Sequence, residues 1–103
     1  MQETNSFQLL IVIVPQELKD NIVDTLIGLE VISGFSLSKI QGYSREHHQY
    51  NIQEQVEGYR DFYRFELLHE QQHYQTLLNH IKESSPNGNI RFWCLPVINA
   101  GLV

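Results

Sequence analysis

A continuous apolar run close to the N-terminus constrains the fold more than any other feature. Residues 9–14, Leu-Leu-Ile-Val-Ile-Val, place six aliphatic side chains in a row, and Pro15 follows them. The run is far too short to cross a membrane, which takes about 20 residues, and its β-branched residues favour a strand over a helix. A strand that is apolar at every position is buried on both faces. The run therefore predicts the central strand of a sheet, over residues 7–14.

Two later segments have helical periodicity. Apolar residues recur at helical spacing from Pro15 onward, and this pattern ends near residues 28–34. A second stripe at i, i+3, i+4 and i+7 is formed by Tyr74, Leu77, Leu78 and Ile81. The sequence Ser-Ser-Pro-Asn-Gly at 84–88 ends this second helix, because it combines a helix breaker with turn-forming residues.

Three further strands are predicted, over residues 34–43, 56–68 and 90–95. In the first of them Ile40 falls out of phase with Leu37, so we expect a bulge near Ser38. In the long strand over 56–68, one face is mostly apolar and the other mixes charged with aromatic side chains. Pro96 either ends the last strand or marks it as an edge strand, because proline cannot donate a ladder hydrogen bond.

The order strand, helix, strand, strand, helix, strand predicts an α+β fold. Two split βαβ units with right-handed crossovers give a ferredoxin-like βαββαβ sandwich, with both helices on one face of an antiparallel sheet. The 103 residues form one domain, 1–103. The other face of the sheet is then bare and carries Arg60, Phe62, Arg64 and Glu66 of the third strand. We expect another subunit to cover it, because sheet faces with this much aromatic surface are usually covered.

Composition and charge limit the partners and the compartment. The chain has 7 Lys and Arg against 12 Asp and Glu, a formal net charge of −5, so it has no bulk attraction for nucleic acid or for an anionic membrane. Cys94 is the only cysteine, so no intramolecular disulfide forms, which fits a reducing compartment. The first seven residues carry no Lys or Arg, unlike a secretory signal. We expect a cytoplasmic protein that does not insert into membranes.

The aromatic residues of segment 58–65 allow a second interpretation as a nucleic-acid surface. RNA-recognition motifs share this strand order and stack bases on exposed aromatic side chains of the third strand. Here Asp61 interrupts the pattern and the chain is acidic, so core and subunit packing explains the aromatics better. We expect no nucleic-acid partner.

The segment from His69 to His73 matches the zinc-protease pattern His-Glu-x-x-His. That chemistry needs both histidines on one helical face and a glutamate that activates water. Here the match lies at a strand-to-helix junction, in a small domain without an evident third ligand, so a solvated helix is the better interpretation. A weaker version is a surface metal patch of His69, His73 and His80.

The polar segment 44–55 is the other place where histidines gather. It reads as an exposed loop, and structureless loops of this length are more often functional than idle. Glu46, His47 and His48 offer a carboxylate and two imidazoles, which suit Zn, Cu or Ni. Two neighbouring histidines seldom complete a site alone, so loops of several subunits would have to supply the remaining ligands.

Three stretches of the chain resemble a bacterial PII-like family. They are residues 34–36, 54–60 and 90–101. That family is similar to the PII signalling proteins and to the CutA divalent-cation-tolerance proteins, and its genes often lie beside heavy-metal efflux systems. The resemblance implies a homotrimer of ferredoxin-like subunits whose sheets face inward. It also places segment 43–55 where PII proteins carry the T-loop, which binds effectors and contacts partner proteins.

These observations predict a non-enzymatic, trimeric PII-like regulatory or sensor protein linked to transition-metal homeostasis. Arg45, Glu46, His47 and His48 are the predicted contacts to an effector or to a protein partner. Arg60 and Arg64 either form an anion site between subunits or pair with Asp61 and Glu66. The alternative is an interaction module that docks on a transporter or another partner through loop 43–55 without a small ligand. An acylphosphatase is a third option, but no segment can be assigned to its phosphate cradle.

Overall fold

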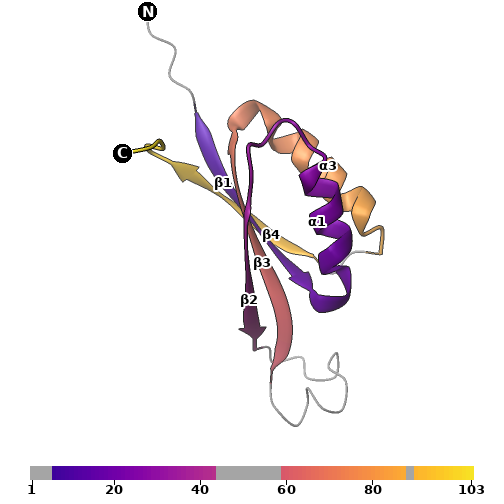
Figure 1. The fold of residues 1–103 in the computed structure, drawn as a ribbon. Helices are drawn as coiled ribbons and strands as arrows, with labels where there is room; N and C mark the ends of the chain where they lie inside the picture. The colour runs from indigo at the N-terminus through magenta and orange to yellow at the C-terminus, as the bar shows by residue number, and fades with distance from the viewer. Residues whose placement is uncertain (1–5, 44–58, 88–89) are drawn as a thin grey trace, which may run out of the picture.

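The computed structural model describes residues 6–43, 59–87 and 90–103. They form a four-stranded antiparallel sheet with two helices in βαββαβ order, the predicted ferredoxin-like fold (Figure 1). Each helix is preceded by one 3-10 turn. The elements are β1 (Phe7–Pro15), η1 (Gln16–Leu18), α1 (Lys19–Ile27), β2 (Ser36–Gly42), β3 (Arg60–Glu70), η3 (Gln71–His73), α3 (Tyr74–Ser84) and β4 (Arg91–Val97).

The apolar run at the N-terminus is a central strand, as predicted. The strand order is β2-β3-β1-β4, and β1 pairs with β3 on one side and with β4 on the other. Leu10 lies between Leu67 of β3 and Cys94 of β4 in the register. The neighbouring strands on each side shield the side chains of β1 on both faces, so that Leu10, Ile11, Val12 and Val14 are at most 2% exposed, which explains the lack of polar residues in the run.

Both helices lie on one face of the sheet, and the core fills the space between them (Figure 1). Alternate residues of β1 and β3 point toward the helices, so the two strands place their apolar side chains in one layer. The helices contribute the residues of the predicted stripes. The fully or nearly fully buried core residues are Leu10, Val12, Val14, Ile22, Leu26, Ile32, Phe65, Leu67, Leu77 and Ile81.

The opposite face of the sheet, called the open face here, carries no helix (Figure 1). Its side chains are the alternate set of each strand, so they follow from the register. Leu68, Trp93 and Leu95 on this face are 41%, 44% and 44% exposed, whereas Leu10, Val12, Phe65 and Leu67 on the helix-covered face are fully buried. Arg60 belongs to this alternate set, as predicted, although its guanidinium reaches Glu17 at the end of the sheet. By register the open face includes Phe7, Leu9, Ile11, Ile13 and Pro15 of β1, Ser36, Ser38, Ile40 and Gly42 of β2, Arg60, Phe62, Arg64, Glu66 and Leu68 of β3, and Arg91, Trp93, Leu95 and Val97 of β4.

Two local predictions are settled by the strand pairing. The bulge expected near Ser38 is wrong, because β2 pairs with β3 in continuous register from Ser36 to Gly42. Ile40 is out of phase with Leu37 because it points to the open face, where it lies beside Phe62. The edge position expected for Pro96 is confirmed, since β4 is the outermost strand. Among the described residues, no helix has the length and apolar character needed to cross a membrane.

Candidate functional site

The β2–β3 hairpin projects beyond the helices at one end of the sheet (Figure 1). Gly42 and Arg60 form its last pair, and the rings of Tyr43 and Tyr59 pack just beyond it, with centroids 5.6 Å apart. A Cβ on Gly42 would lie 2.5 Å from the ring of Phe62, so any larger residue there would displace that ring. The two strands are therefore packed closely at the point from which the chain continues into residues 44–58.

A pocket of about 270 Å³ lies at the same end of the sandwich, on its helix side. It lies between the start of the first helical segment and the turn that follows α3. Its walls combine apolar side chains with amide, hydroxyl, carboxylate and guanidinium groups that can form hydrogen bonds to a ligand. The polar lining residues are Glu17, Asn21, Arg60, Ser84, Ser85 and Asn87.

Arg60 connects this pocket to the hairpin. Its guanidinium donates a hydrogen bond to Glu17, with 2.9 Å between Nη2 and Oε2, and lies 5.6 Å from the centroid of the Phe62 ring. The Arg60 side chain is mostly buried, whereas the Glu17 side chain is largely exposed. An anion that enters the pocket can therefore compete with Glu17 for the guanidinium, because the Glu17 side chain is 65% exposed and its pairing is weakened by water.

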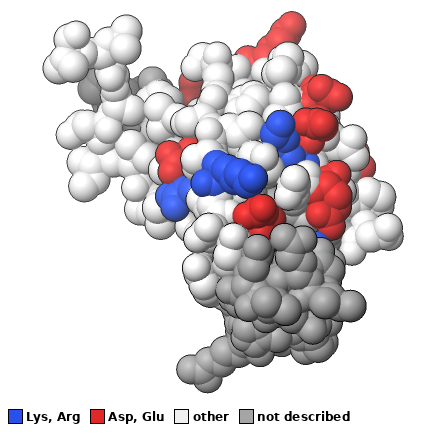
Figure 2. Space-filling model, turned by 60° about the horizontal axis from the view of Figure 1, so that its bottom comes forward, with Lys and Arg blue, Asp and Glu red and all other residues white. Residues whose placement is uncertain are grey.

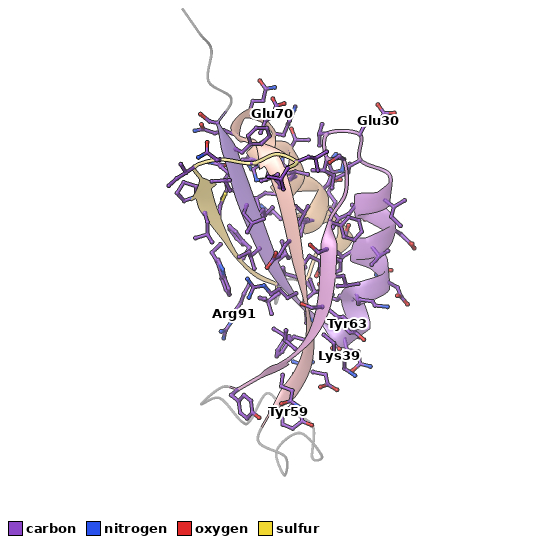
Figure 3. All side chains as sticks on the ribbon, turned by 60° about the vertical axis from the view of Figure 1, so that its left-hand side comes forward. Glu30, Lys39, Tyr59, Tyr63, Glu70 and Arg91 are labelled. Atoms are coloured by element: carbon purple, nitrogen blue, oxygen red, sulfur yellow. The ribbon has the colours of Figure 1, made fainter. Side chains whose placement is uncertain are left out.

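Other charged groups at this end are also paired. Figure 2 shows acidic and basic side chains side by side on this part of the surface. Lys39 and Asp61 lie 3.7 Å apart across β2 and β3, and the Lys19 ammonium lies 5.2 Å from the centroid of the Tyr63 ring. Tyr63, Lys39 and Tyr59 succeed one another toward this end of the sheet, whereas Glu30 and Glu70 lie at the other end (Figure 3).

The structure directs Arg60 and Arg64 to different carboxylates. Arg64 lies on the open face and holds Glu66, with both Nε and Nη2 at 2.9 Å from Oε2. Arg60 holds Glu17 instead of Asp61. The two guanidinium groups therefore do not converge on one anion within a single chain.

The predicted loop contacts Arg45, Glu46, His47 and His48 lie outside the described residues. The three other histidines are placed as follows. His69 is the last but one residue of β3 and is 2% exposed, and its Nδ1 donates to the Glu70 carbonyl at 2.8 Å. His73 and His80 are half-buried on η3 and α3.

This placement bears on both metal interpretations of these histidines. His69 lies in a strand and His73 in a 3-10 turn, so they do not share a helical face as the zinc-protease pattern requires. His69 packs on the Tyr74 ring in the core, with 6.3 Å between ring centroids, instead of lying in a surface patch. In the part of the chain that the structure describes, no three His, Cys, Asp or Glu side chains are grouped to hold a metal.

Cys94 lies within β4, as expected, and is half-buried. Its thiol donates a hydrogen bond to the side-chain oxygen of Gln8, with 3.4 Å between Sγ and Oε1. Burial raises the pKa of the Cys94 thiol above its ordinary value. The environment therefore favours the protonated form and suits a packing role rather than a nucleophilic one.

Cys94 is accordingly expected to react slowly with iodoacetamide at neutral pH. A raised pKa lowers the thiolate fraction, and the strand shields the sulfur, so we expect alkylation at least about tenfold slower in the native protein than in urea. Mass spectrometry of quenched time points measures both rates. Equal rates in the two states would contradict the packing role.

Comparison with known proteins shows the family of this chain. The family described as "Protein of unknown function (DUF3240)" matches residues 4–103. A crystal structure of a DUF3240 family protein from Shewanella baltica OS155 is 37% identical, with a TM-score of 0.81, and the alignment covers 97% of this chain and 99% of that one. The chain belongs to the DUF3240 family. None of the curated proteins matches it in sequence.

The fold of this DUF3240 chain is also that of the PII proteins. Arabidopsis thaliana PII, in a crystal structure with citrate bound, superimposes with a TM-score of 0.66 at 15% identity, covering 91% of this chain and 77% of that one. The predicted PII-like architecture is confirmed by this similarity.

Sequence reasoning missed most of the pocket of this DUF3240 chain. Ser84, Ser85 and Asn87 were read only as residues that stop a helix, and the pattern did not single out Glu17. Arg60 and Glu17 are 43 positions apart, so nothing in their local pattern predicts the pair. The usable signal is the predicted topology, which brings the start of the first helical segment and the end of the second helix to the same end of the sheet.

Proposed function

We propose that this DUF3240 chain is a non-enzymatic, homotrimeric regulatory protein of the PII type that acts in the cytoplasm. The observation that carries the proposal is the position of Arg60, which pairs with Gly42 at the end of the β2–β3 hairpin and also lines the pocket. A ligand that binds the Arg60 guanidinium in the pocket therefore contacts the end of this hairpin directly. We expect the segment that joins the two strands to present that response to a partner protein.

The open face supports the oligomer. Trp93, Leu95 and Leu68 expose nearly half of their surface on the side without helices. Contiguous apolar surface of this kind is characteristic of a protein interface. Closed rotational symmetry would let identical copies cover one another's sheets, and the resemblance to the PII proteins implies that the number of copies is three.

The proposed input is a transition-metal ion. His47 and His48 with Glu46 offer nitrogen and oxygen ligands that suit Zn, Cu or Ni. In a trimer, three copies of this short segment supply more ligands than one chain can. Arg45 and Arg60 are the proposed contacts to an anionic effector or to an acidic partner.

Calorimetric titration of the purified protein with Zn²⁺, Cu²⁺ and Ni²⁺ tests the metal proposal. We expect at least one ion to bind with a Kd below about 1 μM. The double variant His47→Ala with His48→Ala should weaken that binding by about 100-fold or more, because it removes both imidazoles.

The matched control is His73→Ala with His80→Ala, which removes two half-buried imidazoles from η3 and α3. This variant should bind the metal as the wild type does. Absence of binding tighter than about 1 μM for all three ions would refute the metal input. If a partner is nevertheless captured, and deletion of residues 45–50 releases it, the chain is a docking module without a small ligand.

A further inference from the structure

The charges at the centre of the open face point to the contact that joins two copies. Arg64 and Glu66 belong to β3, one of the two central strands, so any association that covers the open face also covers this pair. In the register, Arg64 lies in a row with Ile13 and Arg91, and Glu66 in a row with Ile11 and Trp93. On the β1 side the pair therefore adjoins Ile11 and Ile13, and on the β2 side it adjoins Ser36 and Ser38.

The contact between Arg64 and Glu66 within one chain leaves some of their hydrogen-bond donors and acceptors without a partner among the described residues. Arg64 donates from Nε and Nη2 to the same oxygen of Glu66, Oε2. Among the described residues, Oε1 of Glu66 accepts no hydrogen bond, and Arg64 also retains its Nη1 donors. Both side chains remain partly exposed.

Covering such a pair with a purely apolar partner is costly. Charges lose hydration on burial, and a buried ion pair is tolerated only when further hydrogen bonds satisfy its remaining donors and acceptors. A second copy of the open face brings the same acid and the same base, in equal number. Glu66 of the second copy can accept a hydrogen bond from Arg64 of the first copy, and Arg64 of the second copy can donate to Glu66 of the first.

The open face does not share the acidic excess of the whole chain. The chain carries −5, so two copies repel one another at long range. Acidic residues such as Glu17, Asp20 and Asp24 lie on the helical side. The open face carries Arg64 and Arg91 against Glu66, so a Glu66 carboxylate of a second copy meets basic groups there, and Arg91 extends on the side away from the helices (Figure 3).

We infer that Arg64 and Glu66 exchange partners between copies, so that Arg64 of one copy binds Glu66 of the next around the oligomer. The inference rests on the proposed oligomer. It adds the contact that fixes how the copies are aligned and why identical copies are preferred as partners. The anion expected between subunits is then a carboxylate of this same protein.

A reciprocal charge exchange tests the inference. The variant Arg64→Glu with Glu66→Arg keeps both charges on the face but reverses their order. If the pair acts between copies, this variant assembles with itself, whereas a contact between it and the wild type places like charges opposite one another. After the two proteins are unfolded together and refolded, native mass spectrometry should show mixed oligomers at least about tenfold below the statistical proportion.

The matched control is Lys39→Asp with Asp61→Lys, which reverses an ion pair on the helix-facing side of the same hairpin. It should mix with the wild type in statistical proportion. Statistical mixing of the reversed Arg64–Glu66 variant, or a reversed variant that folds but stays monomeric, would overturn the inference while the wild-type oligomer stands. A monomeric wild type would instead overturn the proposed oligomer itself. Circular dichroism of each variant shows whether it folds.

Discussion

Replacing Phe65 with alanine is expected to lower the free energy of unfolding by about 3–5 kcal/mol. The Phe65 side chain is fully buried between Val12 of β1 and Leu37 of β2, and its ring lies 5.8 Å from that of Phe35. Its removal leaves a cavity that a sheet paired on both sides cannot close. Urea denaturation at a fixed protein concentration measures the change, because the stability of an oligomer depends on concentration.

The control for this substitution is Phe92→Ala. Phe92 is also a strand residue, but it is 46% exposed at the outer edge of the sheet, so its loss should cost less than about 1 kcal/mol. Equal costs for the two variants would mean that the layer between sheet and helices is not the main source of stability.

Replacing Trp93 with glutamate is expected to dissociate the oligomer. Trp93 is 44% exposed on the open face, next to Ile11 in the register and on the same strand face as Leu95. A buried interface tryptophan often contributes 2 kcal/mol or more to binding, and a carboxylate in its place would be buried among apolar groups. The dissociation constant should therefore rise by about 30-fold or more, which sedimentation velocity over a concentration series measures.

Phe92→Glu is a closely matched control for Trp93→Glu. The two residues are neighbours on β4 with almost equal exposure, but alternation along the strand points them to opposite faces of the sheet. Phe92→Glu should leave the oligomer intact. An oligomer that survives Trp93→Glu, or that is lost equally with Phe92→Glu, would show that the open face is not the interface.

The fold could be predicted from the sequence because its signals are local and agree with one another. The run at 9–14 fixed a central strand, the stripe from Tyr74 to Ile81 fixed a helix, and 84–88 ended it. The predicted bulge near Ser38 is wrong because the prediction assumed that Ile40 faces the helices, whereas it lies on the open face. Ile40 is apolar although it faces away from the helices, because its neighbour on that face is the apolar Phe62. A prediction that expects apolar residues on only one face of a strand fails where apolar side chains lie on both faces.

The candidate site was less predictable because its parts are distant in sequence. The pairing of Arg64 with Glu66 was one of the alternatives read from their spacing along one strand, and the structure confirms it. Arg60 was predicted to bind an anion or Asp61, but its partner Glu17 comes from a different element. For His69, the residue types alone suggested a metal ligand, and only the three-dimensional packing shows a buried ring hydrogen-bonded to its own strand.

The position of β4 has a consequence for the order in which the molecule is made. The register pairs Phe7 with Val97, so the edge of β1 opposite β3 stays unpaired until β4, the last strand in the chain, has been made. Contacts this distant along the chain form late, because the loop they close is long. Trp93 and Leu95 arrive with that same last strand. If the open face is the interface, a partly synthesised chain has Arg64 and Glu66 but lacks the apolar surface of β4, and stable association follows completion of the sheet.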